Sequence, residues 1–269
     1  KKLSAIQNLG SIDVLCSDKT GTITEGVVKW SKAIDVENIE SSKALLYAYL
    51  NANFETGFSN PIDEAIRNIK GIDTEAYKKM DEVPYDFIRK RLSVVVETDG
   101  KHIMITKGSV NTILAVCSTV ETSLGGIVAI NKMNSALEKL YERYSSEGFR
   151  VIAISYKDVT GDPVINKDDE SGMIFLGLLV FSDPPKEGII ESIRQLRKKG
   201  IDLKIITGDN AHVARYLASQ INLGSSAMLT GTDLHDLSSD ALRIKVEGIK
   251  VFAEILLAQK ERIIKALQQ

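Results

Sequence analysis

Short apolar runs alternate with amphipathic segments near both ends of the chain. Residues 12–16 are apolar and typical of a buried strand. Residues 201–206 and 249–253 also favour strands. Residues 187–199 and 256–267 have the spacing of amphipathic helices. Because alternating strands and helices form parallel sheets with crossover helices, and the first strand needs a sheet to join, we expect one Rossmann-like domain built from both ends.

The middle of the chain, residues 28–182, has a different pattern, which predicts a separate α+β unit. Residues 91–98 and 102–106 favour strands around the dipeptide Asp99-Gly100, which is a strong signal for a hairpin turn. Further elements are expected as helices at residues 42–51, 110–116 and 133–145, strands at residues 149–156 and 173–181, and a surface loop at residues 157–171.

One helix of the middle unit has recognisable ends. Asn60 can act as its N-cap, and Pro61 suits its first position. Gly71 is placed to end it. The expected fold class is therefore α/β: a discontinuous Rossmann-like domain, residues 1–27 and 183–269, with the α+β unit inserted after its first strand.

The residues that follow the first strand supply the chemistry that a phosphoryl group needs. They are Asp18-Lys19-Thr20-Gly21-Thr22, which combine a carboxylate, a cation, small hydroxyl groups and a glycine. An acidic residue at the carboxyl end of such a strand lies at the crevice where open α/β sheets bind ligands. Because carboxylates can attack phosphoryl groups to give an aspartyl phosphate, we interpret Asp18 as a nucleophile.

Two further motifs can complete such a site. Thr207-Gly208-Asp209 follows another expected strand, where a hydroxyl and backbone N–H groups could hold phosphoryl oxygens, although a helix cap is the alternative interpretation. Lys260 begins the last expected helical segment, where an isolated lysine is more often exposed to solvent. The sequence contains neither a Walker A motif nor a GxGxxG fingerprint.

The motif DKTGT at residues 18–22, followed by Ile and Thr, resembles the phosphorylation signature of P-type ATPases, a branch of the haloacid dehalogenase superfamily. The resemblance implies a haloacid dehalogenase-type phosphorylation domain formed by residues 1–27 and 183–269, truncated at its C-terminus. Residues 28–182 would be the inserted nucleotide-binding domain. The implied reaction is transfer of the γ-phosphate of ATP to Asp18, which would drive cation transport.

The same resemblance assigns roles around Asp18. Mg²⁺ would bridge the Asp18 carboxylate and the phosphate, with the backbone carbonyl of Thr20 as a further ligand. The residues expected to stabilise or orient the transferring group are Lys19, Thr207, Gly208, Asp209 and Lys260. Residues 253–258 depart from the family pattern, because relatives usually carry a basic residue and a Thr-Pro turn there.

The resemblance also places ATP in the middle unit. Phe87 resembles the aromatic residue that stacks on adenine, and Lys107-Gly108 resembles the pocket lysine with its close-approach glycine. Asp63 lies where relatives carry an acidic residue near the adenine amino group. The alternatives are core packing for Phe87, a surface position for Lys107 and a helix-start charge for Asp63. The other implied nucleotide contacts are Arg89 and Arg150 at the phosphate chain and Asp183 at the hinge.

Position 20 separates two kinds of enzyme. Soluble phosphatases of this superfamily usually carry Asp two residues after the nucleophile as a general acid and base, whereas this chain has Thr20. An aspartyl phosphate without that carboxylate should persist, which favours a pump over a soluble haloacid dehalogenase-type phosphatase. A nucleotide-binding module without chemistry is a third hypothesis.

Four segments resemble bacterial magnesium-transporting P-type ATPases in particular. They are residues 8–16, 60–66, 81–87 and 181–187. The expected transported ion is therefore Mg²⁺, with Ca²⁺ or another cation as the alternative, because the ion ligands of such pumps lie in membrane helices.

The expected parent protein is an integral membrane pump, with this region on the cytoplasmic face of the cell membrane. The 269 residues contain no apolar run long enough to span a bilayer, and their net charge of −2 does not favour nucleic-acid binding. The sequence ends before the Gly-Asp-Gly-x-Asn-Asp segment of relatives. We therefore expect a soluble fragment that binds ATP with little or no turnover, and whose partners are the actuator and transmembrane domains.

Overall fold

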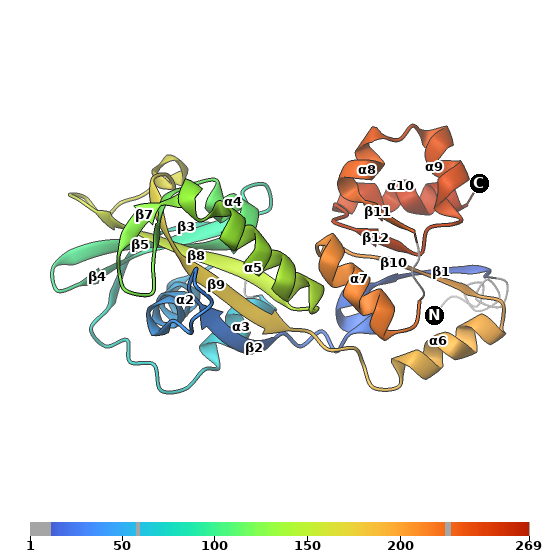
Figure 1. The fold of residues 1–269 in the computed structure, drawn as a ribbon, viewed down its shortest axis with the longest axis horizontal. Helices are drawn as coiled ribbons and strands as arrows, with labels where there is room; N and C mark the ends of the chain where they lie inside the picture. Colours follow the sequence, from blue (N-terminus) through green and yellow to red (C-terminus); the bar gives the residue numbers. More distant parts are fainter. Residues whose placement is uncertain (1–11, 58–59, 224–226, 269) are drawn as a thin grey trace. The chain divides into compact units, whose positions relative to one another are not determined.

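The computed structural model describes residues 12–57, 60–223 and 227–268. Residues 8–11, part of one of the four resembling segments, lie outside these ranges. The described residues form two compact units (Figure 1). Unit 1 draws on the segments 1–27, 145–148 and 183–269, and unit 2 on the segments 28–144 and 149–182. Each unit has its own sheet and its own cores.

In the described part of unit 1, a parallel sheet of four strands lies at the centre. In pairing order the strands are β1 (Val14–Asp18), β10 (Asp202–Ile206), β12 (Val251–Ala253) and β11 (Met228–Thr230). β1 pairs with β10 so that Asp18 lies beside Ile206. The parallel sheet predicted from the alternating pattern is thus confirmed, and the carboxyl ends of its strands meet at one edge.

Helices cover both faces of this sheet. They are α6 (Ile189–Lys198), α7 (Ala211–Gln220), α8 (Gly231–Asp236), α9 (Ser239–Val246) and α10 (Leu257–Leu267). The neighbouring strand residues Ile205 and Ile206 point to opposite faces: Ile205 packs with Leu217 of α7, whereas Ile206 packs with Ile263 of α10. Burying each such aliphatic side chain stabilises the fold by about 1.5–3 kcal/mol, so both helix layers hold the sheet edge in place.

Unit 2 is built on a larger, mixed sheet. In pairing order its strands are β3 (Lys78–Asp86), β4 (Arg91–Thr98), β5 (Lys101–Ser109), β8 (Arg150–Val159), β9 (Met173–Ser182), β6 (Cys117–Glu121) and β7 (Ile127–Ala129), and β2 (Lys29–Ile34) pairs with β9. The strands pair antiparallel except β6 with β9. The predicted hairpin is present, and both Asp99 (φ +49°) and Gly100 (φ +70°) adopt the left-handed turn conformation.

The two faces of the unit 2 sheet have separate cores. The helices are α2 (Ser42–Phe54), α3 (Pro61–Arg67), α4 (Val110–Leu114) and α5 (Asn134–Ser146). α2 and α3 pack on the face that carries Ile105 and Ile154. α4 packs on the opposite face, which carries Ala153. The short turns η2 (Ile130–Lys132) and η3 (Lys167–Asp169) lie in the connections.

Several element boundaries differ from the sequence-based expectations. α3 ends at Arg67 instead of near Gly71, because the Ile69 N–H bonds back to the Ile66 carbonyl and tightens the last turn. The first residues of the expected loop 157–171 continue β8 to Val159. The elements that the pattern did not predict are β2, β3, β6, β7, β11, α8 and α9.

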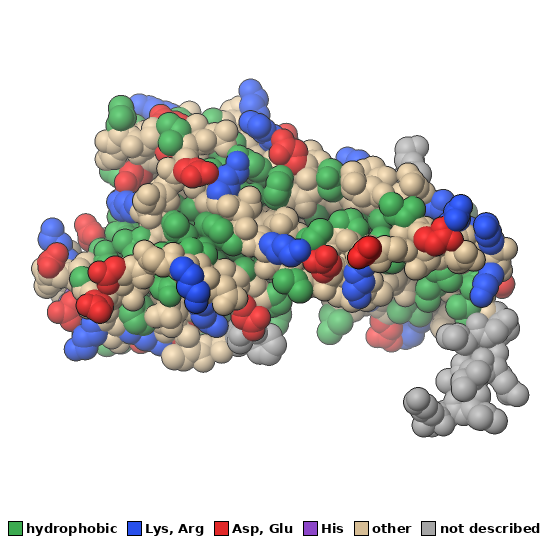
Figure 2. All heavy atoms as spheres, turned by 90° about the horizontal axis from the view of Figure 1, so that it is seen from below, with side chains coloured by type: hydrophobic (Ala, Val, Ile, Leu, Met, Phe, Trp, Pro, Cys, Tyr) green, Lys and Arg blue, Asp and Glu red, His purple; other side chains and the backbone are tan. Residues whose placement is uncertain are grey.

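No helix in the described ranges is both long and apolar enough to cross a bilayer. On the face drawn in Figure 2, acidic and basic side chains are interspersed, in keeping with the net charge of −2.

Candidate functional site

Asp18 is the last residue of β1, and both of its carboxylate oxygens accept hydrogen bonds. Its Oδ1 accepts the backbone N–H of Lys19 at 2.7 Å, and its Oδ2 accepts the ammonium of Lys260 at 2.6 Å. The Asp18 side chain is 49% exposed and that of Lys260 is 29% exposed. The predicted nucleophile therefore has a fixed direction, an adjacent positive charge and access from solvent.

The loop after β1, η1 (Lys19–Ile23), depends on two glycines. Gly21 has a φ of +74° and Gly26 a φ of +72°, a conformation that other residues rarely adopt. A Cβ atom on Gly26 would lie 2.7 Å from the Cα of Gly21, so only glycine lets the loop close on itself. Thr20 lies exposed in this loop.

Lys19 is buried between two aspartates of unit 1. Its ammonium lies 2.6 Å from Asp209 Oδ2 and 3.3 Å from Asp183 Oδ2. Asp183 also accepts the Thr24 hydroxyl at 2.9 Å. The resemblance implies that Lys19 faces the transferring group and that Asp183 lies near the nucleotide. The structure gives both side chains partners within unit 1, which favours a positioning role for each.

The loop after β10 places Thr207 beside the same sheet edge. Thr207 is buried, and its N–H donates to the Phe252 carbonyl at 2.9 Å. Its hydroxyl accepts the Asp209 N–H at 3.1 Å across Gly208. α7 is capped instead by Asn210, whose side chain accepts the Val213 N–H at 2.9 Å. The helix-cap interpretation of Thr207 is therefore wrong, and its hydroxyl proton is available to a ligand oxygen.

Lys260 reaches Asp18 from the first turn of α10. The segment before it departs from the family pattern, yet hydrogen bonds fix its backbone. The Glu254 N–H donates to the Asp209 carbonyl at 2.9 Å, and the Gln259 amide donates to the Gly231 carbonyl at 2.8 Å. The start of α10 is thereby tied to the Thr207 loop, which explains how Lys260 can be aimed without a Thr-Pro turn.

The edge of unit 1 could accept a divalent cation together with a phosphate. In the described part of the chain, no group of three or more His, Cys, Asp or Glu residues could hold a metal alone. Mg²⁺ binds oxygen atoms and usually keeps several waters, so a carboxylate from Asp18 and the carbonyl of Thr20 form a chemically suitable partial ligand set. The donor types fit such an ion.

A second group of candidate residues lies on unit 2, at the face covered by α2 and α3. Lys107 of β5 forms an ion pair with Asp63 of α3, and both side chains are buried. The Asn60 side chain accepts the Asp63 N–H at 3.1 Å and also bonds the Asp63 carboxylate. Burial lowers the pKa of Lys107, and the Asp63 carboxylate opposes that shift. Lys107 is thus no surface lysine, and Asp63 is more than a helix-start charge.

Gly108 permits a close approach of neighbouring backbone, as its position in the motif implies. A Cβ atom there would lie 2.6 Å from the Lys90 carbonyl oxygen and 2.5 Å from the Arg91 Cβ. Lys90 itself turns the chain between β3 and β4 with a φ of +51°. Any side chain at position 108 would push this turn away from β5.

Tyr85 is a candidate that the sequence analysis missed. Phe87 is 84% exposed, which excludes core packing, whereas Tyr85 is 43% exposed and packs edge-to-face on it with centroids 5.5 Å apart. Burial raises the pKa of Tyr85, and the nearby positive charge of Arg150 opposes that rise. Tyr85 lies in an irregular part of β3, between the Val83–Ser93 and Asp86–Arg91 pairs, and the intervening β4 residue, Leu92, pairs with Lys107. The signal was the aromatic residue directly after a proline.

Arg89 and Arg150 have different surroundings. Arg89 bonds the side chains of Asp86 and Glu170 and donates to the Pro84 carbonyl at 2.8 Å. The Glu170 side chain is fully buried, so Arg89 anchors the β3–β4 turn. The Arg150 side chain makes no hydrogen bond or ion pair with any described residue, although Arg150 pairs with Phe181 at the start of β8. The Arg150 guanidinium is therefore available for a ligand, whereas each nitrogen of the Arg89 guanidinium already bonds a protein group.

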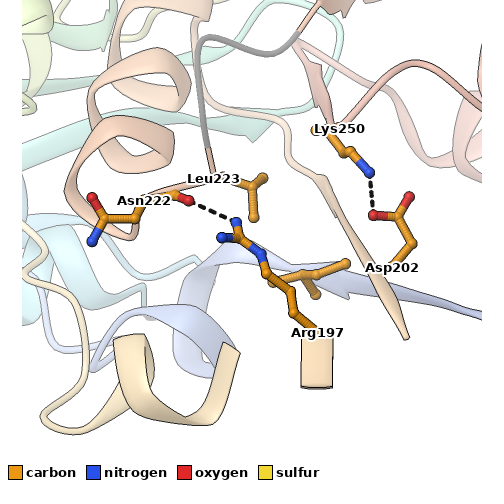
Figure 3. A pocket seen from close by; sticks show the side chains of 6 residues that line it. Arg197, Asp202, Asn222, Leu223 and Lys250 are labelled. Carbon is orange, nitrogen blue, oxygen red and sulfur yellow. Dashed lines mark hydrogen bonds and ion pairs between the residues drawn. The ribbon is translucent and has the colours of Figure 1, made fainter. Parts of the chain in front are cut away.

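A cavity of about 230 Å³ lies elsewhere on unit 1 (Figure 3). Its lining includes Asp202, which begins β10, and Lys250, which precedes β12. These residues mark the amino ends of the strands, opposite the edge that carries Asp18. Lys250 pairs with Asp202, and Arg197 donates to the Asn222 carbonyl at 2.6 Å, so its charged groups already have partners. The cavity is not part of the Asp18 site.

The sequence is similar to sequences of P-type ATPases. The model of a family described as P-type ATPase, cytoplasmic domain N, matches residues 5–188. The magnesium-transporting ATPases, P-type 1, of Salmonella typhimurium and Escherichia coli K12 are each 35% identical over the whole chain, which covers 31% of each protein. Calcium-transporting ATPase 1 of Lactococcus lactis is 30% identical over the whole chain, with 33% of it covered. The chain spans about a third of the length of these relatives.

Proposed function

The chain belongs to the P-type cation ATPase family, and on that premise we propose that it is the ATP-binding and phosphorylation region of a magnesium pump. Unit 1 is the haloacid dehalogenase-type phosphorylation domain, divided at residues 27 and 183. Residues 28–182, which contain unit 2, form the nucleotide-binding domain. The region faces the cytoplasm, and its partners are the actuator and transmembrane domains of the pump.

The contact between Lys260 and Asp18 supports this proposal most strongly. It joins the end of β1 to the first turn of α10 at 2.6 Å, at the edge where Thr207 also lies. A half-exposed carboxylate beside an ammonium and a buried hydroxyl suits in-line attack on a phosphoryl group. Catalysis of phosphoryl transfer rests mainly on such positioning and charge stabilisation.

In the proposed reaction a carboxylate oxygen of Asp18 attacks the γ-phosphorus of ATP. The new bond joins Asp18 to phosphorus, the bond to the β,γ-bridging oxygen breaks, and ADP leaves with that electron pair. Lys260 and the Thr207 hydroxyl stabilise charge on the phosphoryl oxygens. Lys19 keeps the loop in place through Asp183 and Asp209. Bound Mg²⁺, held by Asp18 and Thr20, would neutralise further phosphate charge.

ATP binds unit 2 along the face that carries Lys107. The Tyr85 ring stacks on the base, Asp63 and Lys107 form the polar end of the pocket, and Arg150 contacts the phosphates. Gly108 keeps the β3–β4 turn close, and Arg89 anchors that turn to Glu170. Base stacking of this kind contributes about 1–3 kcal/mol.

Thr20 supports a pump over a phosphatase. A carboxylate at this position would activate water against the aspartyl phosphate, and threonine lacks that basicity. The intermediate should therefore last long enough for a conformational change. Mg²⁺ as cargo rests on the higher identity to magnesium-transporting than to calcium-transporting relatives.

The test is incubation with ATP labelled at the γ-phosphate in the presence of Mg²⁺. We expect an acid-stable, hydroxylamine-sensitive label on Asp18 that EDTA and Asp18→Asn both abolish. A label that survives Asp18→Asn contradicts the assignment of the nucleophile. Rapid release of phosphate from small phosphoesters would instead support a soluble phosphatase.

A further inference from the structure

A second buried carboxylate lies next to the Asp63–Lys107 pair. Glu55 directly follows α2, and its side chain is only 5% exposed. Its Oε1 accepts the guanidinium of Arg67 at 2.8 Å. Arg67 is the last residue of α3, four residues after Asp63, so the two side chains lie on one face of that helix.

Arg67 joins the ends of α2 and α3. Besides bonding Glu55, its Nε donates to the Ala52 carbonyl at 2.7 Å. This carbonyl belongs to the last turn of α2, where no helical N–H is left to satisfy it. The planar guanidinium thus fixes the position of α3 at two points, and α3 in turn presents Asp63 to Lys107.

The residue after Glu55, Thr56, connects the end of α2 to β3. The Thr56 N–H donates to Glu82 Oε2 on β3 at 2.9 Å. β3 also carries Tyr85. Glu55 and Thr56 therefore link α3, with its Asp63, to the strand that carries the aromatic ring.

The charges of this cluster are coupled. Burial raises the pKa of Glu55, as does the Asp63 carboxylate, whereas Lys107 and Arg67 oppose that rise. Burial lowers the pKa of Lys107, the carboxylates of Asp63 and Glu55 oppose that shift, and the positive charge of Arg67 adds to it. The groups facing Lys107 thus come from α3 and from the end of α2.

We propose that Glu55 is a positioning residue for ATP binding, which acts through Arg67 and the Asp63–Lys107 pair. This inference rests on the proposed nucleotide-binding function of unit 2. Glu55 holds α3 against α2, and its negative charge keeps Lys107 protonated in a buried place. A neutral lysine would neither pair with Asp63 nor attract a phosphate-bearing ligand.

These charges determine whether ATP affinity rises or falls with pH. Lys107 loses its proton as the pH rises through its pKa, and ATP affinity falls with it. In Glu55→Gln the opposing negative charge is gone, so the pKa of Lys107 falls further. The loss of affinity should then begin at a lower pH than in the parent chain.

Two measurements test this inference. The first follows the ¹³Cε signal of Lys107 through a pH titration of the ATP-free chain, with Lys107→Met to assign the signal. The second is calorimetric titration with ATP between pH 6 and pH 9. Glu55→Gln is compared with Glu55→Asp, which keeps the charge, and with Glu75→Gln, which removes an exposed carboxylate.

We expect the midpoint pH of the Lys107 titration to be lower in Glu55→Gln than in the parent chain and unchanged in Glu75→Gln. In Glu55→Asp it should lie between the values of the parent and of Glu55→Gln. ATP affinity should fall about threefold to tenfold in Glu55→Gln, with the larger loss at high pH. An unchanged Lys107 midpoint, or a uniform loss at every pH, overturns the inference while ATP binding by the parent chain stands. A parent chain that does not bind ATP overturns the proposed function, whatever the Lys107 midpoint shows.

Discussion

The ammonium of Lys260 lies 2.6 Å from the Oδ2 of Asp18, although 242 residues separate the two in sequence. β1 ends at Asp18 and the first turn of α10 begins nearby in space, because both elements belong to one parallel sheet unit. The whole central unit 2 lies between them along the chain. The contact therefore forms only when the segments of unit 1 on either side of unit 2 fold together.

Replacing Lys260 should impair phosphorylation far more than stability. Lys260→Met removes the cation beside Asp18, and we expect label transfer from ATP to fall about 10-fold to 100-fold, since charge-assisted contacts contribute about 1.5–3 kcal/mol. The pair is partly exposed, so unfolding free energy should change by less than about 1 kcal/mol. Lys260→Arg is the control and should retain part of the labelling. Equal labelling in Lys260→Met and the parent would contradict the proposed role.

Replacing Lys19 should destabilise unit 1. Lys19→Met leaves the Asp183 and Asp209 carboxylates buried without their cation, which costs about 3–5 kcal/mol. Hydrogen exchange of β10 amides measures this loss, while the fluorescence of Trp30, the one tryptophan of the chain, reports on unit 2. Lys199→Met, at an exposed position of unit 1, is the matched control. Unchanged exchange in Lys19→Met would mean that the buried triad is not formed.

The two aromatic residues of the β3–β4 turn should differ in their effect on ATP affinity. Tyr85→Ala is expected to weaken binding about tenfold or more, because the base loses its stacking partner. Phe87→Ala should weaken binding about threefold or less, since stacking on Tyr85 is the main contribution and Phe87 only supports that ring. Calorimetric titration measures both. The reverse order would restore the sequence-based assignment of Phe87.

Replacing Arg150 should weaken ATP binding, whereas replacing Arg89 should lower the stability of unit 2. Arg150→Ala is expected to weaken ATP binding about tenfold with little change in unfolding, because its guanidinium has no partner among the described residues. Arg89→Ala should lower the unfolding free energy of unit 2 by about 1–3 kcal/mol, since the fully buried Glu170 loses one of its two arginine partners and keeps Arg91. Urea unfolding followed by Trp30 fluorescence gives the second quantity. Equal stability losses in the two variants would argue against this division of roles.

Local sequence signals predicted much of unit 1. The apolar run before Asp18 and the Thr207-Gly208-Asp209 motif both follow strands, and parallel pairing brings the ends of these strands together. Lys260 could be assigned only through the family resemblance, because an isolated helix lysine has no distinguishing pattern. The short elements between residues 228 and 246 were missed because a strand of 3 residues and helices of 6 and 8 residues give too little periodicity to detect.

Unit 2 was harder to predict because its charged residues find partners across the sheet. Nothing local to Arg89 indicates that Glu170, 81 residues away, holds it. β3 was missed because it is an edge strand with many polar residues and Pro84, which weakens the alternating pattern. The different exposure of Tyr85 and Phe87 is likewise not visible in sequence, so the choice between them as the stacking residue stays a prediction.

The most direct test of the account is an NMR titration of the isotope-labelled chain with ATP. We predict that the shifted resonances cluster on Tyr85, Lys107 and Arg150, because these residues are the proposed ATP contacts on unit 2. Shifts confined to the Asp18 and Thr207 loops, or no shifts at all, would contradict a nucleotide site on unit 2 and favour a small-substrate phosphatase.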